Sequence, residues 1–76
     1  MLTSQDRAFL VAVGKRIREI RHKRGISQEE LGFRCKLDRT YISSVERGRR
    51  NLGLANLNRI ARALNVRPAA LLSDRE

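Results

Sequence analysis

Four polar side chains fall within a short stretch whose other positions include two β-branched apolar residues. The polar residues are Arg39, Thr40, Ser43 and Ser44. If the stretch is helical, Ile42 and Val45 face a core and the polar residues face outward. An arginine on such a flank can grip O6 and N7 of guanine through two hydrogen bonds, and a threonine offers a hydroxyl and a methyl to base edges. The chemistry that these residue types favour is base recognition in the DNA major groove.

The two short helices predicted here have the spacing that such recognition needs. Ser27 followed by Glu30 is the pattern of a capping box and predicts a helix over residues 28–35. Asp38 is a good N-cap for a second helix over residues 39–47. Only three residues separate the two, as in a helix-turn-helix, whose second helix enters the major groove. The sequence therefore predicts that residues 39–47 form a recognition helix.

Further polar residues flank these helices and are predicted to bind phosphates. Gln28 opens the first helix, where free N–H groups and the helix dipole favour an anion. Tyr41 has two possible roles: it contacts a phosphate or sugar of the DNA backbone, or it covers the hydrophobic core. The whole predicted phosphate-binding set is Gln28, Arg34, Tyr41, Arg47, Arg49, Arg50 and Asn51. Such contacts set the position of a protein on DNA without reading its sequence.

The charge of the chain points to the same kind of partner. The 76 residues include 17 Lys and Arg against 8 Asp and Glu, a net charge of +9, and fourteen of the 17 cations are arginine. Arginine is favoured where planar contact with phosphates or base edges matters. A domain this basic is expected to bind a polyanion, most often nucleic acid. With only three aromatic residues, stacking on single-stranded RNA is disfavoured.

The remaining periodicity is helical and predicts an all-α fold with one domain. Helices are expected over residues 5–24, 54–64 and 68–72, with Thr3 or Ser4 capping the first and Gly53 capping the one at 54. Gly14 inside the first helix is expected to cost about 1 kcal/mol relative to alanine. The domain is expected to span residues 1–76, with a core at about 5–72 and a loose tail at 73–76.

Nothing in the chain predicts catalysis, a metal site or a cofactor. There is one histidine and one cysteine, and adjacent Glu29 and Glu30 point about 100° apart on a helix. Cys35 is expected to be a small core residue. Because no catalytic arrangement is found, we expect that the protein is not an enzyme. No signal peptide or membrane-spanning stretch is found, so we expect the protein to be soluble and cytoplasmic.

Several motifs taken together resemble a known family. They are Ile20-Arg21, Gly25-Ile26-Ser27-Gln28-Glu29-Glu30-Leu31, Tyr41-Ile42 with Val45-Glu46-Arg47-Gly48, and Leu57 to Leu71 with Ile60-Ala61. The combination resembles the lambda-repressor/Cro-type (Xre-like) helix-turn-helix family over residues 9–72. The stretch 37–43 also resembles the restriction–modification controller proteins, a small dimeric branch of that family.

The resemblance implies a five-helix bundle that binds a near-palindromic operator as a homodimer and regulates transcription. It implies that Gln28 contacts a phosphate, that the four polar residues of helix 39–47 face bases or nearby backbone, and that Arg21 and Glu46 form a salt bridge. Three positions depart from the family pattern: Lys36 at the turn, Leu52 in the following loop and Gly53 at the next cap. The dimer contacts are expected from apolar residues left over near the C-terminus, Leu54, Val66, Leu71 and Leu72.

Some roles stay open at this point. An antitoxin that also regulates its own synthesis is the alternative function, although no additional toxin-binding arm is evident. Glu29 is either a solvated charge or an acidic contact for RNA polymerase. No small-molecule effector is expected, so control would come from the concentration of the dimer.

Overall fold

The computed structural model describes residues 1–73, in which five helices and no β-strand are found. The helices are α1 (Ser4–Lys23), α2 (Gln28–Cys35), α3 (Arg39–Glu46), α4 (Gly53–Ala63) and α5 (Pro68–Leu72). The all-α prediction is confirmed, and each expected boundary lies within one residue of the observed one. Residues 74–76 of the expected tail lie outside the described residues.

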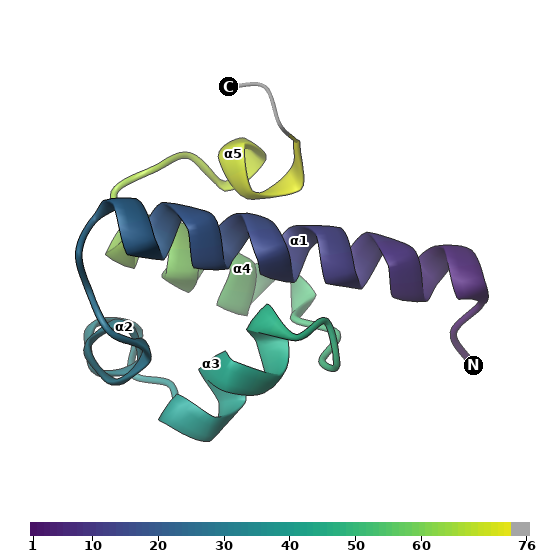
Figure 1. Cartoon of the computed structure of the whole chain (residues 1–76), viewed down its shortest axis with the longest axis horizontal. Helices are drawn as coiled ribbons and strands as arrows, with labels where there is room; N and C mark the ends of the chain where they lie inside the picture. Colours follow the sequence, from purple (N-terminus) through teal and green to yellow (C-terminus); the bar gives the residue numbers. More distant parts are fainter. Residues whose placement is uncertain (74–76) are drawn as a thin grey trace.

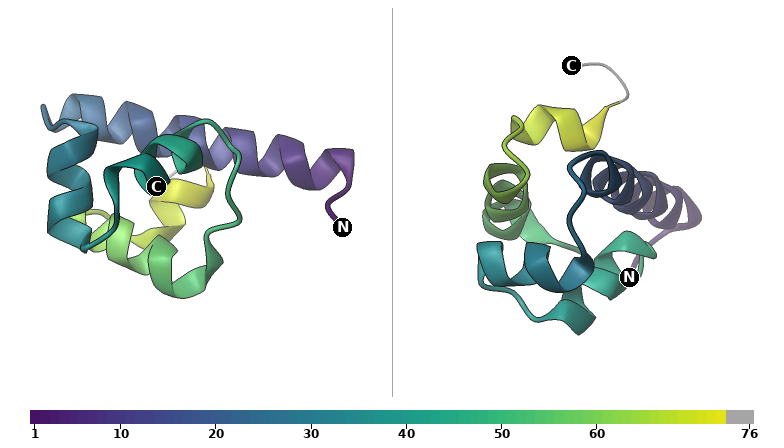
Figure 2. Two further views of the ribbon diagram at one scale, coloured as in Figure 1. Left: turned by 90° about the horizontal axis from the view of Figure 1, so that it is seen from below. Right: turned by 60° about the vertical axis from the view of Figure 1, so that its left-hand side comes forward.

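The long helix α1 crosses the molecule and separates the other helices into two groups. Figure 1 shows α5 on one side of α1 and the pair α2 and α3 on the other. Helix α4 packs against both α2 and α5, and Figure 2 shows it between them. This arrangement leaves the first turn of α3 at an outer edge of the bundle (Figure 1).

One stripe of each helix faces a common core. The apolar positions repeat at three- and four-residue intervals, which places them on one side of a helix. The largest side chains that are completely or almost completely buried are Ile17, Leu31, Ile42, Val45, Ile60, Leu64 and Leu71. Because Ile42 and Val45 anchor α3 in this core, its opposite flank is left for other contacts.

The expected cap at Thr3 is present, whereas the capping box predicted at Ser27 and Glu30 is only half formed. At α1, Thr3 Oγ1 accepts from the N–H of Asp6 and Asp6 accepts from the N–H of Thr3, which completes a capping box. At α2, only the bond from the N–H of Glu30 to Ser27 Oγ is observed in the described region, because the Glu30 carboxylate accepts from Arg34 instead.

The predicted N-cap role of Gly53 is wrong. Gly53 is the first residue of α4 and has a φ of +74°, and no side chain caps this helix. Glycine adopts this left-handed conformation without the steric cost of a Cβ atom, so the chain enters α4 through backbone geometry rather than through a side-chain cap.

Candidate nucleic-acid interface

The turn before α3 is built by two local devices. Lys36 ends α2 in the left-handed conformation, with φ +59° and ψ +41°, which costs a non-glycine residue about 1–2 kcal/mol. Asp38 then caps α3: its Oδ1 accepts from the Thr40 N–H at 2.8 Å and from the Thr40 hydroxyl. The hydrogen bond from the Thr40 hydroxyl, followed by the Thr40 N–H and the charge of Arg39, lowers the pKa of Asp38. The cap therefore fixes the orientation of the first turn of α3.

The polar flank of α3 is open to solvent at its N-terminal end. Arg39 and Thr40 are exposed, whereas Ser43 and Ser44 are half-buried. Arg47 Nη1 donates to Ser43 Oγ at 2.8 Å. In the described region no hydrogen bond or ion pair holds the Arg39 side chain, so its guanidinium is available to an external acceptor.

A buried charge network joins α3 to α1 and α2. Arg21 Nε donates to Glu46 Oε2 at 2.6 Å, and Arg21 Nη2 donates to Glu46 Oε1 at 2.9 Å. Arg21 Nη1 donates to the carbonyl of Ile26 at 2.9 Å, and Gln28 Nε2 donates to Glu46 Oε1 at 3.0 Å. The ion pair implied by the family resemblance is thus present in the structure, and the amide of Gln28 is held at the first turn of α2.

Tyr41 connects α3 with α4 and with the loop between them. Its ring packs against the core, and its hydroxyl accepts from Asn56 Nδ2 at 3.1 Å. The guanidinium carbon of Arg50 lies 5.2 Å from the centre of the ring, within range of a cation–π interaction. Asn56 was not included in the sequence prediction, since a single polar residue in a helical pattern gives no signal of its partner.

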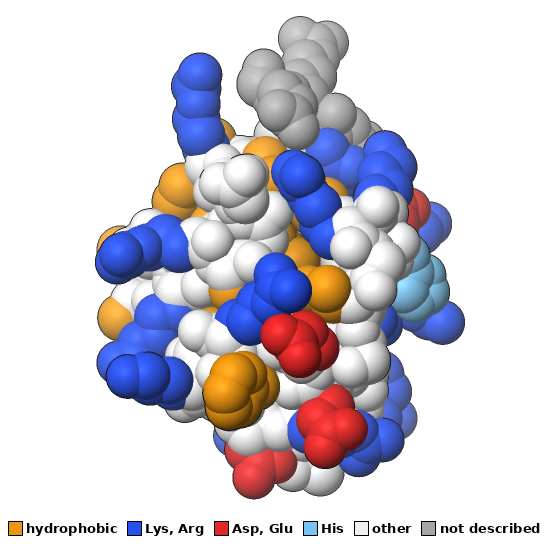
Figure 3. Space-filling view, turned by 90° about the vertical axis from the view of Figure 1, so that its left-hand side faces the viewer, with side chains coloured by type: hydrophobic (Ala, Val, Ile, Leu, Met, Phe, Trp, Pro, Cys, Tyr) orange, Lys and Arg blue, Asp and Glu red, His pale blue; other side chains and the backbone are white. Residues whose placement is uncertain are grey.

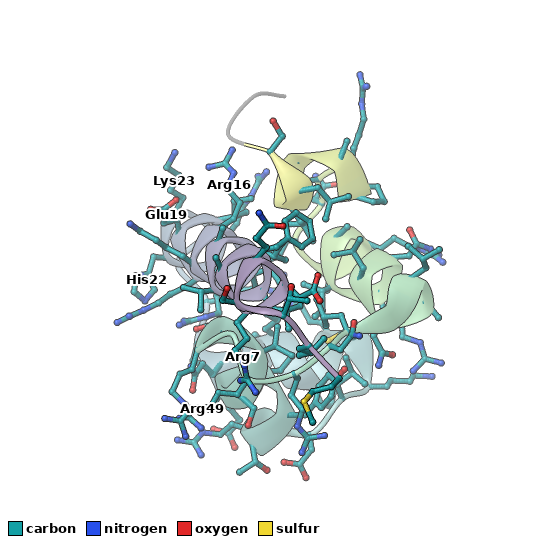
Figure 4. The ribbon with its side chains drawn as sticks, turned by 90° about the vertical axis from the view of Figure 1, so that its right-hand side faces the viewer. Arg7, Arg16, Glu19, His22, Lys23 and Arg49 are labelled. Carbon is teal, nitrogen blue, oxygen red and sulfur yellow. The ribbon has the colours of Figure 1, made fainter. Side chains whose placement is uncertain are left out.

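The other phosphate-binding candidates lie at the ends of these helices. Arg49, Arg50 and Asn51 are exposed in the loop after α3, and Arg34 is exposed on α2, where its Nε donates to Glu30 at 2.8 Å. Figure 4 shows Arg49 on the same side of the molecule as Arg7 from α1, a residue that the sequence analysis did not select. Arg34 is therefore paired with Glu30. Arg49 and Arg50 form no ion pair within residues 1–73, although Arg50 contacts the ring of Tyr41.

The four residues predicted to form the dimer interface differ in their exposure to solvent. Leu54 is 83% exposed and Leu72 is 45% exposed, so both are available to a second chain. Leu71 is 1% exposed and belongs to the core, so its assignment to a surface contact is wrong. Its side chain fills the space between α5 and the neighbouring helices. Val66 is half-buried and packs against the core.

An apolar hollow beside Leu54 is also lined by Phe9, a residue that the sequence analysis did not assign to the dimer interface. It has a volume of about 340 Å³, and Phe9, Leu54, Leu57 and Leu72 are among its lining residues. Phe9 is 53% exposed because α1 extends beyond the body of the bundle at this end. Helical periodicity does not show where a helix extends beyond its neighbours, so it gives no signal that Phe9 is exposed.

Residues 1–73 provide neither a cluster of metal ligands nor a membrane-spanning helix. In the part of the chain that the structure describes, no group of three or more His, Cys, Asp or Glu residues could hold a metal ion. None of the helices formed by residues 1–73 has the length and apolar character needed to cross a membrane.

The fold and the arrangement of α2 and α3 define a helix-turn-helix protein. The sequence pattern of the helix-turn-helix family matches residues 17–71. The chain therefore belongs to this family, of the Xre-like type.

Its similar proteins include restriction–modification controller proteins. Control protein C.BamHI of Bacillus amyloliquefaciens is 52% identical over 60 residues, which cover 78% of this chain and 74% of that protein. The crystal structure of the controller protein C.AhdI from Aeromonas hydrophila has a TM-score of 0.83 and 48% identity, covering 84% of this chain and 97% of that one. The controller protein C.Esp1396I, solved as a tetramer with its natural 35-base-pair operator, has a TM-score of 0.77 and 40% identity, covering 83% of each chain.

Proposed function

We propose that this chain is a sequence-specific regulator of transcription that binds double-stranded DNA as a homodimer, with α3 in the major groove. The observation that carries the proposal is the open first turn of α3. Arg39 and Thr40 are exposed there, while Ile42 and Val45 hold the helix in the core. Arg39, Thr40, Ser43 and Ser44 read bases or adjacent backbone in this proposal, as the side-chain chemistry of each allows.

The surroundings of α3 support this orientation. Gln28, Arg34, Tyr41, Arg47, Arg49, Arg50 and Asn51 contact phosphates on either side of the groove. The complex of C.Esp1396I with its operator shows that a relative with 40% identity binds DNA as an oligomer. In a symmetric dimer the two copies of α3 lie about 34 Å apart, one turn of the duplex, and meet successive major grooves of a near-palindromic operator.

Selection of bound duplexes from a random DNA pool tests this proposal. The expected result is a motif with two-fold symmetry and half-sites one helical turn apart, recovered with the unaltered chain. A matched selection with Arg39→Ala should lose preference at one base position in each half-site. Recovery of duplexes with no common motif would contradict sequence-specific binding, and an asymmetric motif would contradict the symmetric dimer.

A further inference from the structure

A cationic hollow lies between the C-terminal end of α2 and the C-terminal half of α4. It has a volume of about 490 Å³ and is lined by Arg34, Cys35, Lys36, Arg59, Arg62 and Ala63. Four of these six residues are cations, and none of the lining residues in the described region is acidic. Figure 3, viewed onto the side of the molecule that carries α2, shows Lys and Arg side chains along the left flank of this face.

Most of this positive charge has no counter-charge within the protein. Arg34 pairs with Glu30 at 2.8 Å. Lys36, Arg59 and Arg62 have neither an ion pair nor a side-chain hydrogen bond in the described region. Three like charges that line one hollow repel one another, and none of the lining residues among residues 1–73 is acidic. A bound anion would turn this repulsion into attraction.

The helix dipole explains only part of the cluster. A cation in the last turn of a helix is favoured by the dipole, which accounts for Arg34 in α2 and Arg62 in α4. Arg59 precedes the last turn of α4. Burial raises the pKa of the Cys35 thiol, and the charge of Arg59 is the smallest of the influences that oppose this increase. The charge of Arg59 on α4 thus reaches Cys35 on α2, across the hollow that both residues line. Both helices therefore contribute positive charge to the same hollow.

We propose that this hollow binds a phosphate group through Lys36, Arg59 and Arg62. Guanidinium groups donate paired hydrogen bonds to phosphate oxygens, and a lysine adds a point charge. The source that the structure favours is the DNA backbone beyond the operator half-site. Lys36 is two residues before Asp38, the cap of the recognition helix, so the hollow continues the predicted DNA-binding surface past the turn. The choice of DNA as the origin of the phosphate group rests on the proposed function.

Two duplexes test the DNA source. One is the selected motif trimmed at its symmetric ends, and the other is the same motif with about ten additional base pairs, one helical turn, on each side. We expect Arg59→Gln/Arg62→Gln to weaken binding of the long duplex roughly tenfold and to leave the short duplex nearly unchanged. The salt slope on the long duplex should fall by about one to two units. The matched control Lys15→Gln/Arg18→Gln removes the same charge from exposed positions of α1 and should leave both duplexes unchanged.

Inorganic phosphate tests the site without DNA. At equal ionic strength, phosphate in place of chloride should raise the melting temperature of the unaltered chain and of the control, and should not raise that of Arg59→Gln/Arg62→Gln. This arm distinguishes the site from the proposed function, because it gives its answer even if no duplex is bound. A phosphate effect without a long-duplex effect would assign the site to free phosphate. Equal responses of the two double variants in both arms would overturn the proposal.

Discussion

Gly14 in α1 lies directly against the carbonyl oxygen of Val45 in α3. A Cβ atom on residue 14 would be 2.2 Å from that oxygen and 2.8 Å from the carbonyl oxygen of Glu46. Both obstacles are backbone atoms at the C-terminal end of α3, so neither can rotate out of the way. The absent side chain at Gly14 therefore sets how closely α1 and the recognition helix approach each other.

Gly14→Ala should destabilise the protein, although alanine favours helix by about 1 kcal/mol. The added methyl group forces α1 away from α3, and overpacking of this kind costs about 1–3 kcal/mol or more. We expect a net loss of about 1–2 kcal/mol in the free energy of unfolding, measured by urea denaturation. Ala12→Gly, at an exposed position of the same helix, supplies the propensity term alone and should cost about 1 kcal/mol. A more stable Gly14→Ala variant would show that the two helices separate freely.

The ion pair between Arg21 and Glu46 is expected to matter mainly when one partner is missing. Arg21→Met leaves a carboxylate that is almost completely buried without its main donor, which should cost about 3–5 kcal/mol of unfolding free energy. Arg21→Met combined with Glu46→Leu removes both charges and should cost less than the single change. Thermal and urea unfolding of the two single variants and the double variant give the coupling energy. Additive losses would mean that the two side chains do not act as a pair.

The cap of α3 should make stability depend on pH in the acid range. The hydrogen bonds from Thr40 lower the pKa of Asp38 in the folded state. A lowered pKa contributes stability that is present above the unfolded pKa, about 4, and is lost as the pH falls through the folded value. Asp38→Asn keeps a capping oxygen but does not titrate. The difference in unfolding free energy between the unaltered chain and Asp38→Asn should therefore shrink below about pH 4, and a difference that stays constant down to pH 2 would contradict this origin.

The sequence predicted the helices well because each has strong local signals. Ser27, Asp38 and Gly25 mark helix ends by their own chemistry, and the expected boundaries at these points were correct to within one residue. Lys36 and Asn65, just beyond the ends of α2 and α4, both adopt the left-handed conformation with φ +59°. Local rules suffice where a residue acts on its own neighbours in the chain.

Apart from the Arg21–Glu46 ion pair, which the family resemblance implied, the features described next depend on distant contacts and were not predicted. The penalty assigned to Gly14 came from helix propensity, and its contact with Val45 reverses the expected effect of alanine. Leu71 was predicted to be available at the surface, but the packing of α5 against α1 and α4 buries it. The Tyr41–Asn56 hydrogen bond and the cluster around Arg59 each join two helices, so neither has a signature within one segment.

Two arginines near α3 should affect DNA binding in different ways. Arg39→Ala should cost about 1–3 kcal/mol and relax preference at one base position, because an arginine that reads guanine discriminates between bases. Arg49→Ala should weaken binding to all duplexes alike and reduce the salt slope by about one unit, because a phosphate contact carries no sequence information. Titrations of the selected duplex and of single-base variants, over a salt series, separate the two effects. Unchanged base preference in Arg39→Ala would show that this residue does not read the sequence.

Leu54 should contribute to dimer formation without stabilising the monomer. Its side chain is 83% exposed beside an apolar hollow, so its truncation removes few contacts within one chain. Leu54→Ser should change the unfolding free energy of the monomer by no more than about 0.5 kcal/mol. It should raise the dimer dissociation constant roughly tenfold or more, because apolar anchors at the centre of an interface carry much of its energy. Sedimentation equilibrium over a range of concentrations measures this change.

Phe33→Ser is the matched control, since Phe33 is 81% exposed on α2 and does not line that hollow. The loss of the Phe33 side chain should leave dimerisation unchanged. If Phe33→Ser dissociates the dimer and Leu54→Ser does not, the two chains meet through α2 and the assignment of the interface to the start of α4 is wrong.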